Sequence, residues 1–186
     1  MLQKIKFLLL TSLIMFAALE VYAETPSFSA DKIKAAYTFQ FTRFATWPTK
    51  ISSVDTPFTI CMLGNEPIAK ELKSLNQYKS EGRSIRIIYP TNVFDTDDCK
   101  ILYIAETKSR KLKDIIRILH NKPILTVSSI PNFALQGGIV GLTLYKNKIR
   151  LEINLASAQR ADIKLSAKLL EIASVITDTS NKEEQP

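Results

Sequence analysis

The stretch Phe133–Asn154, FALQGGIVGLTLYKNKIRLEIN, decides how the C-terminal half of this chain folds. It holds three of the five glycines, Gly137, Gly138 and Gly141, just before two runs of alternating apolar and polar residues. Alternation with a period of two is typical of half-buried strands. Between the runs lies Lys146-Asn147, and asparagine tolerates the left-handed backbone of a two-residue turn. The stretch therefore predicts an antiparallel hairpin that turns at Asn147.

The glycines also raise the alternative of a phosphate-binding loop. Such a loop places its glycines after a strand and at the start of a helix, so that helical N–H groups face the anion. Here Gly137 and Gly138 precede a strand, and neither GxGxxG nor GxxxxGK[ST] occurs in the chain. We interpret both glycines as structural turn residues between a short helical turn at residues 131–135 and the hairpin.

The residues before this stretch alternate between short apolar runs and helical patterns. We expect strands at residues 57–63, 84–89, 101–105 and 124–127, and helices at residues 66–75 and 108–120. In the second helix, the residues expected to face inward are Leu112, Ile115, Ile116 and Leu119. Strands that alternate with helices predict an α/β fold with a mostly parallel sheet.

Helical segments are also expected at both ends of this domain. Asp31 is a candidate N-cap for a helix that runs to Thr46, where Trp47-Pro48 ends it. After the hairpin, residues 155–161 and 166–176 predict two further helices, the second capped by Ser166. The predicted fold is a single α/β domain whose mostly parallel sheet is flanked by helices and extended by the C-terminal antiparallel hairpin.

The first 23 residues have the pattern of a secretory signal peptide. Lys4 and Lys6 precede an apolar run of about 13 residues, too short for the roughly 20 that span a bilayer. The small residues Val21 and Ala23, at the −3 and −1 positions, predict cleavage after Ala23. We then expect residues 24–176 to form one exported domain and residues 177–186 a flexible tail.

Positive charge is concentrated in one part of the chain. Residues 24–99 carry 9 Lys or Arg and 9 Asp or Glu, whereas residues 100–170 carry 13 against 4. A basic segment of this kind favours an anionic partner. Because an exported protein rarely meets nucleic acid, anionic lipid headgroups or an acidic protein face are the better candidates. The alternative is a basic surface that is only solvated and binds no partner.

Cys61 and Cys99 are the only cysteines. In an oxidising compartment, an even pair is most simply a disulfide, and the spacing does not match a CxxC redox motif. A bridge across this loop would stabilise the domain by roughly 3–4 kcal/mol.

The residues that catalysis or metal binding would need do not form a recognisable set. His120, the only histidine, lies at the end of a predicted helix before Asn121-Lys122-Pro123, which is a stop signal. With one histidine and two paired cysteines, a zinc site lacks ligands. Asp95, Asp97 and Glu106 match three positions of a calcium-binding EF-hand loop, but Lys100 stands where that loop needs glycine. We therefore expect no catalytic residue, no metal and no cofactor.

The first predicted helix is unusually aromatic. Ile33, Tyr37, Phe41 and Phe44 fall on one helical face and predict a core-facing stripe. Phe39 lies off that stripe, and with Trp47 it forms a candidate partner-binding patch, although both can equally belong to the core.

Several segments, in order, resemble the YfiR-like family of exported bacterial proteins. They are KAAYTFQFTRFATWP, FTICMLG, CKILYIAE and the long segment from Ile124 to Ala173. The resemblance implies a non-catalytic periplasmic regulator that restrains an inner-membrane diguanylate cyclase through the periplasmic region of that enzyme. It also implies a tendency to dimerise, relief by an outer-membrane lipoprotein, and pairing of Cys61 with Cys99.

The leading hypothesis is thus a regulatory binding protein that lowers cyclic di-GMP signalling. An apolar patch would supply the affinity, and basic residues would steer association. The candidate partner-binding residues are Phe39, Trp47, Lys108, Arg110, Lys111, Arg117 and Arg150. One alternative is a periplasmic small-molecule-binding sensor, with its ligand at the strand ends, or an accessory protein of another membrane signalling system. Another alternative is a hydrolase that uses His120.

Overall fold

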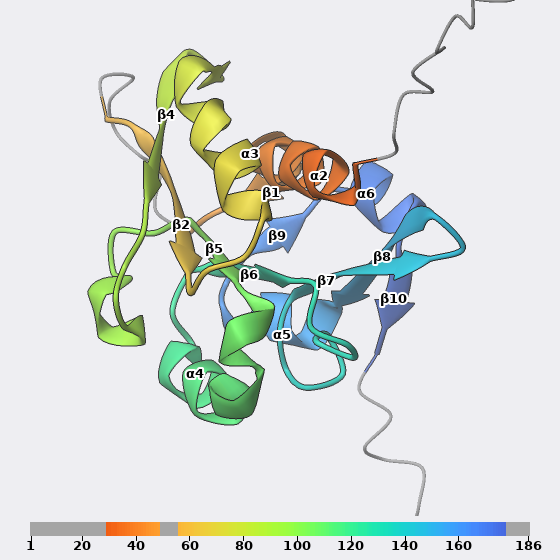
Figure 1. The fold of residues 1–186 in the computed structure, drawn as a ribbon. Coiled ribbons are helices and arrows are strands. Elements are labelled where there is room, and N and C mark those ends of the chain that lie inside the picture. Colours follow the sequence, from red (N-terminus) through yellow and green to blue (C-terminus); the bar gives the residue numbers. More distant parts are fainter. Residues whose placement is uncertain (1–28, 49–55, 178–186) are drawn as a thin grey trace, which may run out of the picture.

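The computed structural model describes residues 29–48 and 56–177, and these form one α/β domain around an eight-stranded sheet (Figure 1). The strand order is β10-β8-β7-β6-β5-β2-β4-β3. Five adjacent strands, from β4 to β7, are parallel, whereas β8 and β3 run antiparallel to their neighbours β7 and β4. The bounds are β2 (Phe58–Leu63), β3 (Lys79–Ser80), β4 (Arg83–Ile88), β5 (Ile101–Ile104), β6 (Leu125–Ser128), β7 (Val140–Tyr145), β8 (Lys148–Asn154) and β10 (Ser174–Ile176).

Helices cover both faces of this sheet. Figure 1 shows α2 (Ala30–Phe44) and α3 (Ile68–Ser74) on one face and α4 (Leu112–Leu119) on the other. The α5 helix (Leu155–Arg160) lies beside α4, and the short α6 (Ala167–Glu171) follows later in the chain. In the described ranges, three 3₁₀ segments lie in the connections: η2 (Leu75–Gln77), η3 (Val93–Asp95) and η4 (Glu106–Lys111). The predicted mostly parallel α/β fold with a C-terminal antiparallel hairpin is confirmed.

The central strands are buried on both faces because helices cover both. In β2, Phe58, Ile60 and Met62 pack into the cluster that contains α2 and α3 residues. Cys61 and Leu63, which point the other way, pack into the cluster that contains α4 residues. Strands in this position are apolar throughout rather than alternating, as FTICML is.

The first helix differs from its prediction at both ends. Ser29, not Asp31, is the N-cap, and its side chain accepts a hydrogen bond from the Lys32 N–H. The helix ends at Phe44 rather than Thr46, because Ala45–Thr46 form β1, which pairs with β9 (Lys164–Leu165). Neither short strand was predicted, since two residues carry no periodicity.

The inward face of α2 also differs from the expected aromatic stripe. The buried residues are Ala35, Thr38, Phe41 and Thr42, whereas Ile33, Tyr37 and Phe44 are only partly buried. The threonines can be buried because their hydroxyls donate to backbone carbonyls of the same helix, at 2.8 Å for Thr38 and 2.7 Å for Thr42. Thr42 also shares a hydrogen bond of 2.6 Å with the Ser80 hydroxyl, so a small polar residue joins this helix to β3.

The last predicted helix, residues 166–176, is wrong in its second half. Ser166 is the N-cap as expected, but α6 ends at Glu171 and Ser174–Ile176 form β10. The new strand pairs in parallel with β8 from Glu152 to Asn154. Val175 and Ile176 are β-branched and favour a strand where an open sheet edge is available. The predicted signal peptide and residues 178–186 of the predicted tail lie outside the described residues.

Candidate functional site

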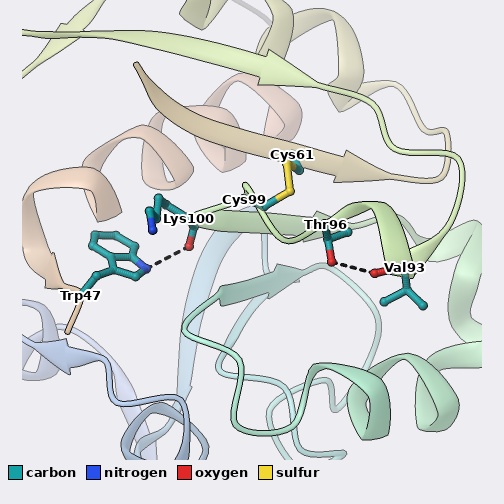
Figure 2. The surroundings of a disulfide bond; sticks show 6 residues. All are labelled: Trp47, Cys61, Val93, Thr96, Cys99 and Lys100. Carbon is teal, nitrogen blue, oxygen red and sulfur yellow. Dashed lines mark hydrogen bonds between the residues drawn. A yellow bond between two sulfur atoms is a disulfide. The ribbon is translucent and has the colours of Figure 1, made fainter. Parts of the chain in front are cut away.

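The disulfide between Cys61 and Cys99 joins the middle of β2 to the loop before β5 (Figure 2). Both residues are buried, and their Cα atoms are 5.7 Å apart. The structure thus confirms the predicted pairing. The bridge closes a loop of 38 residues that contains α3, β4 and η3, and so holds η3 against the parallel sheet.

Hydrogen bonds fix the loop between η3 and the disulfide. The Asn92 side chain accepts from the Phe94 N–H at 2.8 Å and donates to Asp95 at 2.6 Å. The buried Thr96 hydroxyl donates to the Val93 carbonyl at 2.7 Å (Figure 2). Asp97 pairs with Lys122 at 2.7 Å. Asp95 and Asp97 therefore organise the loop. The described residues contain no group of three or more His, Cys, Asp or Glu that could hold a metal ion.

Phe94 stands out on this loop because it is 68% exposed, the highest value among the large hydrophobic residues of the described ranges. It lines a cleft of about 250 Å³ between η3 and the η4–α4 segment, which we call the Phe94 cleft. The apolar lining includes Leu63, Val93 and Ile115. The charged lining residues are Lys108, Lys111 and Asp114, and Asp114 is paired with Arg117. An aromatic side chain at the edge of an apolar cleft with a charged rim is the usual composition of a protein-docking site.

The expected helix over residues 108–120 is divided, and this division arranges the basic residues. Its first turn belongs to the 3₁₀ segment η4, where side chains three positions apart lie on the same side. Lys108 and Lys111 therefore both reach the cleft, while Arg110 is exposed elsewhere. Arg117 on α4 pairs with Asp114 at 2.8 Å. Arg150 lies on β8, in the hairpin, so the seven candidate residues do not form one surface.

The two aromatic candidates have internal contacts. Trp47 is partly buried, and its Nε1 donates to the Lys100 carbonyl at 3.1 Å (Figure 2). Its ring meets Phe58 edge-on. Phe39 is partly buried between Tyr78, at 5.8 Å between ring centroids, and the Arg43 guanidinium, at 5.3 Å. Trp47 thus links the end of α2 to the loop that follows the disulfide.

The carboxyl ends of β2 and β5 form the position where open α/β sheets often bind ligands. Here Glu66 occupies it. Its carboxylate accepts from the Tyr103 hydroxyl at 2.9 Å and from the Glu106 N–H at 2.7 Å. Burial, and then the negative charge of Glu66, raise the pKa of Tyr103 far above its usual range, so the phenol stays neutral and donates. The side chains of the protein thus fill this end of the sheet.

The glycines before the hairpin have steric reasons for their identity. Gly137 has a φ of 93°, a backbone conformation that other residues rarely adopt. A Cβ at Gly138 would lie 2.1 Å from the buried Phe133 ring. In the hairpin turn, Lys146 and Asn147 have φ values of 47° and 59°. His120 is the exposed C-cap residue of α4.

Sequence reasoning missed Phe94, Glu66 and Tyr103. Phe94 could have been found, because an aromatic residue in the acidic turn TNVFDTDD, between two predicted strands, has no place in either strand. Glu66 and Tyr103 are 37 positions apart, and only the tertiary fold brings them together.

The sequence matches the YfiR/HmsC-like family over residues 31–174, which is most of the chain. The chain belongs to the YfiR/HmsC-like family. That family consists of periplasmic regulators of cyclic di-GMP signalling, acts by regulation rather than catalysis, and works with membrane signalling proteins. A search of the curated proteins gave no match. Within residues 29–48 and 56–177, no helix is both long and apolar enough to cross a bilayer.

Proposed function

We propose that this protein binds the periplasmic region of an inner-membrane diguanylate cyclase and holds the enzyme inactive, which lowers cyclic di-GMP output. Membership of the YfiR/HmsC-like family carries this proposal. Export through cleavage after Ala23, assembly as a homodimer and relief by an outer-membrane lipoprotein are parts of the same proposal.

We place the docking surface at the Phe94 cleft. Its loop is held by the disulfide and by the Asn92 and Thr96 hydrogen bonds, so little conformational entropy is lost when a partner binds. Phe94 offers an apolar anchor, and Lys108 and Lys111 favour a partner with acidic residues around an apolar centre. Arg110 is exposed on the same 3₁₀ segment but does not line the cleft.

The test is co-purification from gently solubilised membranes with the C-terminally tagged protein. Recovery of an inner-membrane protein with a cytoplasmic diguanylate cyclase domain supports the proposal. Recovery of the tagged protein alone contradicts it and favours the small-molecule sensor.

A charged substitution in the cleft then locates the docking surface. Phe94→Asp should weaken partner binding about 30-fold, because a well-placed anchor contributes roughly 2 kcal/mol or more. Cyclic di-GMP in the cell should rise accordingly. The matched control is Leu135→Asp, since Leu135 is similarly exposed, at 64%, and does not line the cleft. Equal losses in both variants would show that the cleft is not the docking surface.

A further inference from the structure

The β7–β8 hairpin extends beyond the rest of the sheet. β6 pairs with β7 only at Val140 and Gly141, and β10 pairs with β8 only from Glu152 onward. Among the strands that the structure describes, residues 142–151 therefore pair only with each other, and we call this segment the hairpin arm. Leu142 and Leu151 at its base are buried in the core. Figure 1 shows it projecting from the sheet, away from α4.

Exposed apolar side chains lie on both faces of the arm. Leu144 is 55% exposed and Tyr145 is 49% exposed. Because successive residues in a strand point to opposite faces, these two side chains point away from each other. A protein that docks on one face of the hairpin would cover only one of them. A medium that surrounds the tip, such as the interfacial region of a bilayer, covers both.

The charges of the arm have a single sign. It carries Lys146, Lys148 and Arg150 and no acidic residue. The Arg150 guanidinium lies 4.3 Å from the centroid of the Tyr145 ring, and the Lys146 ammonium lies 5.4 Å from it. In the part of the chain that the structure describes, none of the three cations forms an ion pair. An amphipathic aromatic ring with unpaired cations beside it is the set that favours the headgroup region.

We propose that the hairpin arm binds the surface of a bilayer that contains anionic phospholipid. Leu144 and Tyr145 enter the interfacial region from the two faces of the tip, and Lys146, Lys148 and Arg150 contact lipid phosphates. The arm is separate from the Phe94 cleft. Binding of the arm to vesicles can therefore be measured without a protein partner, and the result does not depend on the proposed function.

The experiment measures co-sedimentation of the purified exported protein with vesicles of phosphatidylcholine, with and without 30% phosphatidylglycerol. We expect binding only to the anionic vesicles, with an affinity that falls as salt rises. Lys146→Gln with Lys148→Gln should weaken binding about 30-fold, since each cation near an anionic surface contributes about fivefold. Leu144→Ser with Tyr145→Ser should also weaken binding, with the charge unchanged.

Two controls separate the arm from net charge and from misfolding. Lys70→Gln with Lys73→Gln removes the same charge from exposed positions of α3 and should leave binding within about twofold. An environment-sensitive fluorophore on Leu144→Cys should shift to the blue with anionic vesicles, and the same label on Lys73→Cys should not.

Three results would overturn the proposal. The first is no sedimentation with anionic vesicles at low salt. The second is an equal loss from the α3 and arm variants, which would mean that only net charge acts. The third is a dimer in solution that the arm variants convert to monomer without any vesicle binding, which would assign the arm to a second copy of the chain.

Discussion

The Phe94 cleft and the hairpin arm both expose an aromatic residue beside lysines, yet they are built differently. The cleft is tied to the sheet by a disulfide and by side-chain hydrogen bonds to the backbone of its own loop. The arm is anchored in the core at its base, through Leu142 and Leu151; beyond them it is held by the backbone ladder between β7 and β8, and its turn residues adopt positive φ.

The difference indicates what each region can recognise. A loop of fixed shape binds a partner of fixed shape without an entropy cost for ordering the loop. An arm that projects from the sheet with exposed side chains on both faces suits a surface that surrounds its tip, such as a bilayer. We therefore expect that a substitution in one region lowers the stability or the binding of that region and leaves the other unchanged.

The largest effect is expected from removal of the disulfide. Cys61→Ala with Cys99→Ala should lower the free energy of unfolding by about 4 kcal/mol, because the unfolded chain regains the freedom of a loop of 38 residues. Urea unfolding of the variant and of the oxidised protein measures this change. Binding through the Phe94 cleft should weaken, whereas binding to anionic vesicles should remain wherever the variant is folded.

Two observations would contradict this prediction. One is two free thiols on titration of the unfolded, unreduced protein, which would show that the bridge does not form. The other is a loss of vesicle binding that equals the loss of partner binding in the folded variant, which would show that the arm and the cleft are one unit.

A smaller effect is expected at Trp47, which braces the same region without a covalent bond. Trp47→Phe removes the Nε1 donor to the Lys100 carbonyl, but that carbonyl still accepts from the Leu125 N–H. The loss of unfolding free energy should be about 1–2 kcal/mol, from one hydrogen bond and part of the ring contact with Phe58.

The control for Trp47 is Tyr89→Phe. The Tyr89 hydroxyl donates to the Ala69 carbonyl at 3.0 Å but is on the surface, so its removal should cost less than about 0.5 kcal/mol. Chemical denaturation measures both variants. If Trp47→Phe cost no more than Tyr89→Phe, Trp47 would have no bracing role and would return to the candidates for a partner-binding residue.

The sequence predicted the regular parts of this fold because their signals are local. Buried strands such as FTICML and the alternation from Val140 to Asn154 depend on neighbours in the chain, and the structure has them within a residue or two. The pairing of Cys61 with Cys99 followed from counting, since no other cysteine exists.

The sequence failed where tertiary contacts override local preference. Residues 174–176 continue a helical pattern, but the open edge of β8 makes them a strand. Of the aromatic stripe of α2, only Phe41 is fully buried, and Thr38 and Thr42 share the inward face with it because their hydroxyls are satisfied by backbone carbonyls. The candidate basic residues come from one basic segment of the sequence, but the fold separates them. Lys108 and Lys111 line the cleft, whereas Arg150 lies on the arm.

The smallest effect is expected at Asn147, and it tests whether the arm opens independently of the core. Asn147 has a φ of 59°, which costs alanine about 1 kcal/mol more than asparagine or glycine. Asn147→Ala should therefore speed amide hydrogen exchange in residues 143–150, the part of the arm without a buried residue, about fivefold and leave β2 and β5 unchanged. Asn147→Gly should restore slow exchange, because glycine adopts this conformation freely. Since residues 143–150 pair with no other described strand, their opening need not break the sheet. An equal rise in β2 and β5 would show that the arm unfolds only with the whole domain, and the contrast between the two regions would then fail.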